Sequence, residues 1–166
     1  NKASDMVGGM VGMASASAAK QADAYVANAS IGDLYETRAA RIALSRSRSD
    51  EVRMFARMML DHHTTSTHQL RSALRSSEVT LAHPELRPEL ELDNRREGMI
   101  RHLQESPDDQ FDRTYLDQQK LAHQETVALH EGYAEHGDNP QLRSVAKGAL
   151  PMVKRHLEAV GRIEPR

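Results

Sequence analysis

The sequence predicts an all-α fold of four long helices, with a long helical connection between the second and the third. Apolar residues recur every three or four positions through most of residues 22–160, as on one face of an amphipathic helix. Capping residues and prolines divide this pattern into separate segments. No segment keeps the strict alternation of apolar and polar residues that a half-buried strand would need.

The first two helices are expected to be joined by a tight connection. The first is predicted over Ala22–Arg46, a segment that contains no proline and a single glycine, Gly32. Ser49 is a good N-cap for the second helix, and two acidic residues directly after it complement the positive end of the helix dipole. The second helix is expected to run to about Ser76.

The connection that follows contains both irregular chain and helix. Residues 77–88 include Pro84 and Pro88 and are predicted to form a loop. A shorter helix is then expected from Leu90 to Gln104, so that the connection can span the length of the bundle.

Two polar–proline pairs predict where the last two long helices begin. Serine and proline at 106–107 are typical of an N-cap and first turn, and the third helix is expected to start there and end at Gly137. Asparagine and proline at 139–140 repeat this signal for the fourth helix, which should run to about Val160. Pro151 is expected to interrupt and kink it.

Four side chains of the kind that bind metals or carry protons fall on the inward faces of four different helices: Glu36, His63, His123 and His156. Such groups are costly to bury alone, yet each occupies a position where alanine, leucine or valine would be expected. Counted from the connections at 46–49 and 137–139, all four lie about three to five turns into the bundle and can share one level. This convergence makes a metal centre plausible.

Other polar residues on these faces are weaker candidates. Asp33 and Asp112 could bind an ion or hold the imidazole rings in place from outside the ligand set. Asp112 lies near the start of the third helix, where a capping or dipole role suits it equally well. Gln119 and His130 also lie on the inward face of that helix. The histidines expected in solvent are His62, His68, His102 and His136.

Residues 1–20 differ in composition from the rest of the chain. They consist mainly of alanine, serine, glycine and methionine, and contain no leucine. Met6, Met10 and Met13 would share one face if this segment were helical, and a row of thioethers can bind Cu(I). The simpler interpretation is a mobile leader or a weak interaction helix, through which the chain could contact another copy or an envelope partner.

Composition excludes several classes of function. Charged residues make up 28% of the chain and the net charge is −2, which does not suggest binding to nucleic acid or to an anionic membrane. No apolar run is long enough to span a membrane. The chain has no cysteine, so disulfides, thiolate metal sites and cysteine nucleophiles are absent. It opens at Asn1, and removal of an upstream signal sequence would account for that start.

Four segments together resemble a known family: GDLYE at 32–36, FARMMLDHHTTSTHQL at 55–70, FDRTYLDQQKLAHQ at 111–124 and LPMVKRHL at 150–157. Their order, over about residues 20–160, is similar to the bacterial family catalogued as domain of unknown function 4142. The positions that match the family pattern are Glu36, Asp61, His63, Phe111, Asp112, Tyr115, His123, Pro151 and His156.

The resemblance implies a ferritin-like four-helix bundle, either exported to the periplasm or attached to the cell envelope. Residues 1–20 would then be an N-terminal leader or interaction segment, residues 21–161 the bundle domain and residues 162–166 a short tail. The family has no settled activity, so the resemblance predicts fold and compartment rather than chemistry.

One departure from ferritin-like di-iron proteins limits the chemistry. Those sites need a Glu-x-x-His motif on each of two helices. Here Leu60 precedes His63, and Val153 precedes His156, at the positions where the glutamates would be. A carboxylate-bridged di-iron oxidase is therefore not expected. Three histidines and one carboxylate suit a single zinc, iron(II) or copper(II) ion instead.

The sequence thus predicts an exported bundle with a buried histidine and carboxylate site that holds one transition-metal ion. The alternative is a non-enzymatic envelope or stress-response interaction module, in which the buried histidines form a structural hydrogen-bond network. The sequence contains no catalytic motif, and a metal-dependent enzyme would further need an open coordination position and access for a substrate.

Overall fold

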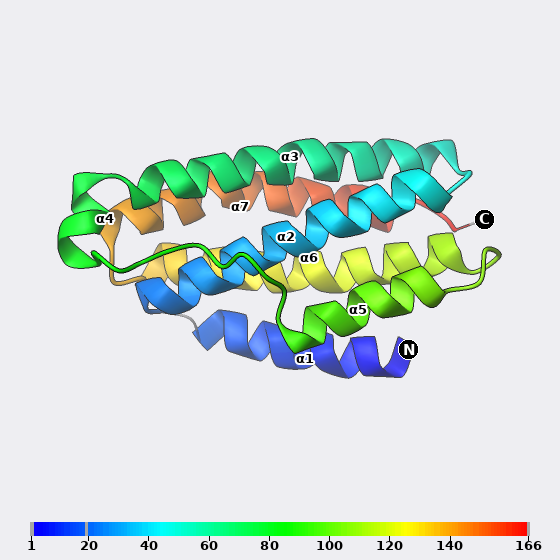
Figure 1. The fold of residues 1–166 in the computed structure, drawn as a ribbon, viewed down its shortest axis with the longest axis horizontal. Helices are drawn as coiled ribbons and strands as arrows, with labels where there is room; N and C mark the ends of the chain where they lie inside the picture. The colour runs from blue at the N-terminus through cyan, green and yellow to red at the C-terminus, as the bar shows by residue number, and fades with distance from the viewer. Residues whose placement is uncertain (1, 19, 166) are drawn as a thin grey trace.

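The computed structural model describes residues 2–18 and 20–165, which form seven α-helices and no strand (Figure 1). The helices are α1 (Lys2–Ala18), α2 (Ala22–Arg46), α3 (Asp50–Leu74), α4 (Ser77–Ala82), α5 (Asn94–Glu105), α6 (Phe111–His136) and α7 (Pro140–Gly161). The prediction of an all-α fold is confirmed.

Four long helices, α2, α3, α6 and α7, lie side by side along the long axis of the molecule (Figure 1). α2 and α7 run in one direction, and α3 and α6 run in the other. The chain therefore has to return along the whole bundle between α3 and α6. Residues 75–110 make this return and include α4, an irregular stretch and α5.

Side-chain caps start the long helices α3 and α7 where the sequence predicts. The Ser49 side chain accepts a hydrogen bond from the backbone N–H of Val52 at 3.3 Å. The Asn139 side chain accepts from the first-turn amides of α7 at 3.0 and 3.1 Å, and Pro140 fills the first helical position. Pro151 lies within α7 but does not end it, since the helix continues to Gly161.

The return connection differs from the prediction in three places. Part of the predicted loop over 77–88 is the short helix α4. α5 begins at Asn94 rather than Leu90, because the Asp93 side chain caps it by accepting from the N–H of Arg96. α6 begins at Phe111, four residues after the serine–proline pair that was expected to start it.

Arg46 explains why the serine–proline pair ends one helix instead of starting the next. Its guanidinium donates to the carbonyl oxygens at the end of α5, those of Leu103, Gln104 and Ser106. Satisfying these carbonyls fixes the end of α5 at Glu105, with Ser106 as the C-cap residue. A turn then follows, closed by a 2.9 Å hydrogen bond from the N–H of Gln110 to the carbonyl of Pro107.

The core has two apolar clusters, one toward each end of the bundle. One includes Phe55, Met59, Leu103, Phe111 and Leu116. The other includes Val26, Leu70, Leu129, Tyr133 and Leu142. On each long helix, the residues between the two clusters include buried polar side chains. Asp33, His63, His123 and His156 therefore lie in the middle of the bundle, whereas Asp112 lies in the first turn of α6.

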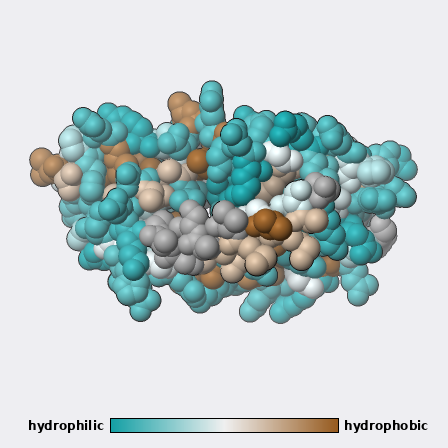
Figure 2. Space-filling model, turned by 90° about the horizontal axis from the view of Figure 1, so that it is seen from below, coloured by the Kyte–Doolittle hydropathy of each residue, from teal (hydrophilic) through white to brown (hydrophobic). Residues whose placement is uncertain are grey.

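Residues 2–18 form α1, which packs against α6 rather than extending away from the bundle (Figure 1). Asp5 anchors it by accepting hydrogen bonds from His102 at 2.6 Å and from Gln118 at 3.2 Å. His102 is thus partly buried, and the expectation that it is solvated is wrong. Four apolar side chains of α1 are exposed, namely Met6, Val7, Met10 and Met13. Figure 2 views the molecule from the side of α1 and shows hydrophobic atoms at this surface.

Among the described residues, none of the helices is both long and apolar enough to cross a membrane.

Candidate metal centre

Three histidines from three different helices meet in the middle of the bundle. His63 comes from α3, His123 from α6 and His156 from α7. One ring nitrogen of each lies within 4.8 Å of the corresponding nitrogens of the other two. The three residues are 8%, 2% and 4% exposed, so all three are buried. The sequence placed all three on inward faces, and the structure brings them together.

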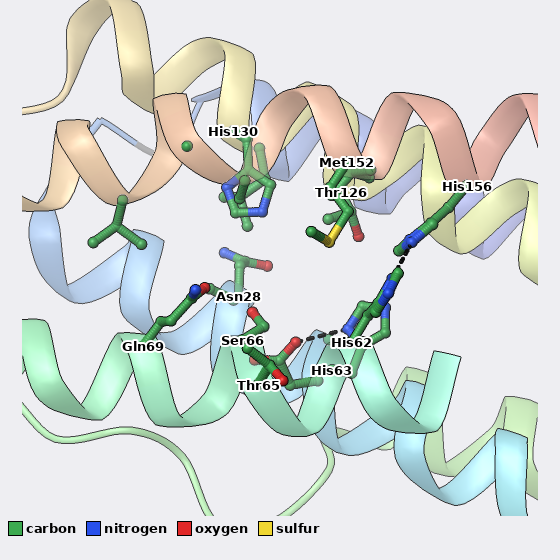
Figure 3. Close-up of a pocket in the computed structure, with 18 of the residues that line it drawn as sticks. Asn28, His62, His63, Thr65, Ser66, Gln69, Thr126, His130, Met152 and His156 are labelled. Atoms are coloured by element: carbon green, nitrogen blue, oxygen red, sulfur yellow. Dashed lines mark hydrogen bonds and ion pairs between the residues drawn. The ribbon is translucent and has the colours of Figure 1, made fainter. Parts of the chain in front are cut away.

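Each of these imidazoles has one nitrogen held by a protein partner. The Nδ1 of His63 lies 2.8 Å from Oδ1 of Asp33 on α2. The Nδ1 of His123 lies 2.7 Å from the carbonyl oxygen of Gln119, one turn earlier on α6, and donates to it. The Nε2 of His156 lies 2.6 Å from Nδ1 of His62 on α3, and the two rings stack with centroids 4.7 Å apart (Figure 3).

The second nitrogen of each ring is buried and has no hydrogen-bond partner in the described part of the chain. These atoms are Nε2 of His63, Nε2 of His123 and Nδ1 of His156. A buried polar atom without a partner costs free energy, and such atoms are rare in folded proteins. Three of them on the neighbouring rings of one histidine cluster therefore call for an explanation, and a cation with nitrogen ligands would provide it.

Burial also keeps two of these histidines ready to bind an ion. It lowers the pKa of His123 to about 4 and, with the nearby His123, His63 and His62, the pKa of His156 to about 3. Both rings are therefore neutral at physiological pH and can donate a lone pair. For His63, burial also lowers the pKa, but the Asp33 hydrogen bond and the charge of Glu36 outweigh it and raise the net value.

Glu36 lies beside this cluster on α2 and is 3% exposed. One carboxylate oxygen accepts from the Gln119 amide at 3.3 Å, while Oε2 is buried and has no partner among the described residues. Burial raises the pKa of Glu36 to about 7, although His63 and Gln119 both favour the charged form. Glu36 is not part of the group of residues whose ligand atoms lie within 4.8 Å of one another. Its carboxylate would therefore have to move toward a bound ion in order to coordinate it.

The spacing of the three nitrogens is compatible with a single ion. Zinc–nitrogen bonds of about 2.0–2.1 Å place tetrahedral ligand atoms about 3.3 Å apart. The nitrogens here all lie within 4.8 Å of each other, a limit that such a spacing satisfies.

The two aspartate candidates, Asp33 and Asp112, have different positions relative to the histidine cluster. Asp33 contacts His63 and also accepts from the hydroxyl of Thr67 at 3.3 Å, which is the role of a residue that orients a ligand. Asp112 lies outside the cluster, in the first turn of α6 and about three turns from His123. There its charge complements the positive end of the helix dipole.

Sequence reasoning missed one contributor to the site. His62 was expected in solvent, but it is partly buried and hydrogen-bonded to His156. Its position at the edge of the apolar face of α3 was the available signal, but only the packing of α7 against α3 turns that edge inward. His68 and His136 are exposed, as expected.

Comparison with known proteins identifies the family. The family model described as domain of unknown function DUF4142 matches residues 10–163. This chain belongs to that family. The match extends into α1, so the DUF4142 region begins earlier than residue 20, where the sequence resemblance was expected to start. No curated protein and no solved structure matches the chain.

Proposed function

We propose that this DUF4142 chain is an exported, ferritin-like bundle that binds one transition-metal ion through His63, His123 and His156. Glu36 is the proposed fourth ligand. The observation that carries the proposal is the set of three buried ring nitrogens that have no hydrogen-bond partner among the described residues, each on an imidazole whose other nitrogen is held by the protein. Holding the far nitrogen fixes both the tautomer and the direction of a metal-binding imidazole.

Two further features support parts of this proposal. The single long return between α3 and α6 is the connection found in ferritin-like bundles, which build metal sites from inward side chains of facing helices. Export to the periplasm or envelope rests on the family resemblance alone, and fractionation of cells that produce the full-length precursor would test it.

The donor set limits the choice of ion. Three imidazoles and one carboxylate suit zinc, iron(II) or copper(II). Leu60 and Val153 replace the glutamates of a di-iron site, which supports one ion rather than two. When bound, the ion would act as a Lewis acid at the bundle core, with Asp33, Gln119 and His62 keeping the three rings oriented toward it.

Calorimetric titration of metal-free protein with zinc, iron(II) and copper(II) tests the proposal. We expect binding of one ion per chain, loss of that binding in His63→Ala and in His123→Ala, and unchanged binding in His68→Ala, whose side chain is exposed on the same helix as His63. If none of the three ions binds to wild-type protein at neutral pH, the alternative of a structural hydrogen-bond network in an interaction module becomes the better account.

A further inference from the structure

A pocket of about 430 Å³ opens onto one side of the histidine cluster. All four long helices line it, and His63 and His156 form part of its wall (Figure 3). A volume of this size is typical of sites for small organic molecules. The pocket provides the route from solvent to the proposed metal site, which the sequence alone did not reveal.

The mouth of the pocket lies between α3 and α7. Its exposed lining residues belong to these two helices, namely Thr65 and Gln69 on α3 and Ser144, Gly148 and Met152 on α7. Its buried lining residues include Leu129, His130 and Val153. The pocket is therefore a cleft that leads from solvent to the core, with His62, His63 and His156 at one end (Figure 3).

Two glycines keep this space open. Gly32 on α2 and Gly148 on α7 both line the pocket, and a β-carbon added at either would meet no described atom within 4 Å. Glycine inside a helix destabilises it by about 0.5–1 kcal/mol relative to alanine. Close packing of the helices requires neither glycine. The chain nevertheless keeps both of them, at a cost in helix stability, and the pocket stays open.

His130 presents a hydrogen-bond donor to the pocket. The ring is 6% exposed, and its Nδ1 lies 3.0 Å from the hydroxyl of Tyr25. Burial raises the pKa of this hydroxyl, which has no other acceptor among the described residues, so it donates to Nδ1. The neutral ring then carries its hydrogen on Nε2, for which the described residues offer no partner. Figure 3 shows His130 projecting into the pocket toward Asn28.

The lining of the pocket indicates an uncharged ligand. None of the described lining residues is a lysine or arginine, and the one carboxylate, Asp33, is engaged by His63. Neutral polar groups such as Asn28, Ser66 and Gln141 alternate with apolar side chains such as Val145. His130 lies two helical turns from His123 on α6, which places its donor about 10 Å from the cluster.

We propose that this pocket binds a small uncharged organic molecule that coordinates the metal at one end and accepts a hydrogen bond from His130 Nε2 at the other. The inference rests on the proposed metal site, since the ion provides one of the two anchors. The second anchor belongs to the pocket alone, because His130 is not a member of the histidine cluster.

Two probes that differ only in the acceptor can test this proposal: 4-(4-acetylphenyl)imidazole and 4-(4-isopropylphenyl)imidazole. The full chain is first loaded with cobalt(II), its cobalt content is measured, and visible absorption is followed during titration with each probe. We expect both probes to shift the cobalt spectrum. The acetyl probe should bind about tenfold more tightly, since it alone accepts the His130 hydrogen bond.

Two variants and a matched control complete the test. His130→Phe should abolish the difference between the probes, and Gly148→Leu should weaken both at least tenfold by filling the pocket. Gly161→Leu makes the same change on α7 at a glycine that also has open space but lies outside the pocket, and it should change neither affinity. Two results would overturn the pocket proposal and leave the metal site intact. In the first, cobalt binds but neither probe changes its spectrum. In the second, the two probes bind with equal affinity. Failure to bind cobalt would overturn both.

Discussion

Each histidine of the cluster gains its direction from a partner outside it. Asp33 orients His63, the Gln119 carbonyl orients His123, and His62 orients His156. An imidazole fixed at one nitrogen can offer only the other, and the three rings lie together in one cluster. The inward position of each histidine could be predicted from helical periodicity. Asp33 was also expected as a residue that could hold an imidazole ring in place. Its pairing with His63 and the pairing of His62 with His156 could not be predicted, because both depend on which faces of separate helices meet.

Asp33→Asn should weaken metal binding by about 10–100-fold without removing a ligand. The amide preserves the shape of the side chain but loses the charge that makes the His63 imidazole a stronger donor. Asp61→Asn is the control, because Asp61 is exposed and lies on the same helix as His63. Calorimetric titration of the two variants checks this expectation. Equal affinity in both would mean that Asp33 does not support the site.

The helices themselves were largely predictable where local chemistry defines their ends. Ser49 and Asn139 cap α3 and α7 through their own side chains, and both starts were predicted. The start of α6 was not, since Arg46, about sixty residues earlier in the chain, fixes the end of α5. The pocket was equally hidden, because a helix glycine reveals open space only when the distance between helices is known.

Gly32→Ala and Gly148→Ala should each raise the free energy of unfolding by about 0.5–1 kcal/mol. The added methyl meets no described atom within 4 Å, while the unfolded chain loses conformational freedom. Gly137→Ala should do the opposite, because its β-carbon would lie 2.5 Å from the ring of Tyr133. Urea denaturation of the three variants measures these changes. Destabilisation by Gly32→Ala or Gly148→Ala would argue against an open pocket.

At the scale of the whole molecule, the polar site lies between two apolar clusters that hold the bundle at both ends. This arrangement lets the protein fold although three buried nitrogens have no partner among the described residues, because the apolar clusters stabilise the bundle independently of the site. α1 adds a further layer on α6, to which it is joined by the hydrogen bond that Asp5 accepts from Gln118. Its packing could not be predicted from residues 1–20, whose small side chains give little periodic signal.

Metal binding should raise the melting temperature of the protein. An ion that binds the folded state alone stabilises it by about 2.7 kcal/mol at a free concentration of 100 times Kd. For a chain of this size, that corresponds to a rise of about 5–10 °C. Scanning calorimetry with zinc, and again after chelation, measures the shift. His63→Ala should melt at the same temperature in both conditions, and a zinc-dependent shift in that variant would place the ion elsewhere.

The central claim is that one ion occupies the space between the three bare nitrogens, and anomalous X-ray diffraction tests it most directly. Crystals of untagged protein would be measured on both sides of the absorption edge of the metal that elemental analysis finds. The account predicts one anomalous peak about 2.0–2.1 Å from Nε2 of His63, Nε2 of His123 and Nδ1 of His156. Ordered water at that point, with no anomalous signal in protein equilibrated with zinc, iron(II) or copper(II), would contradict it.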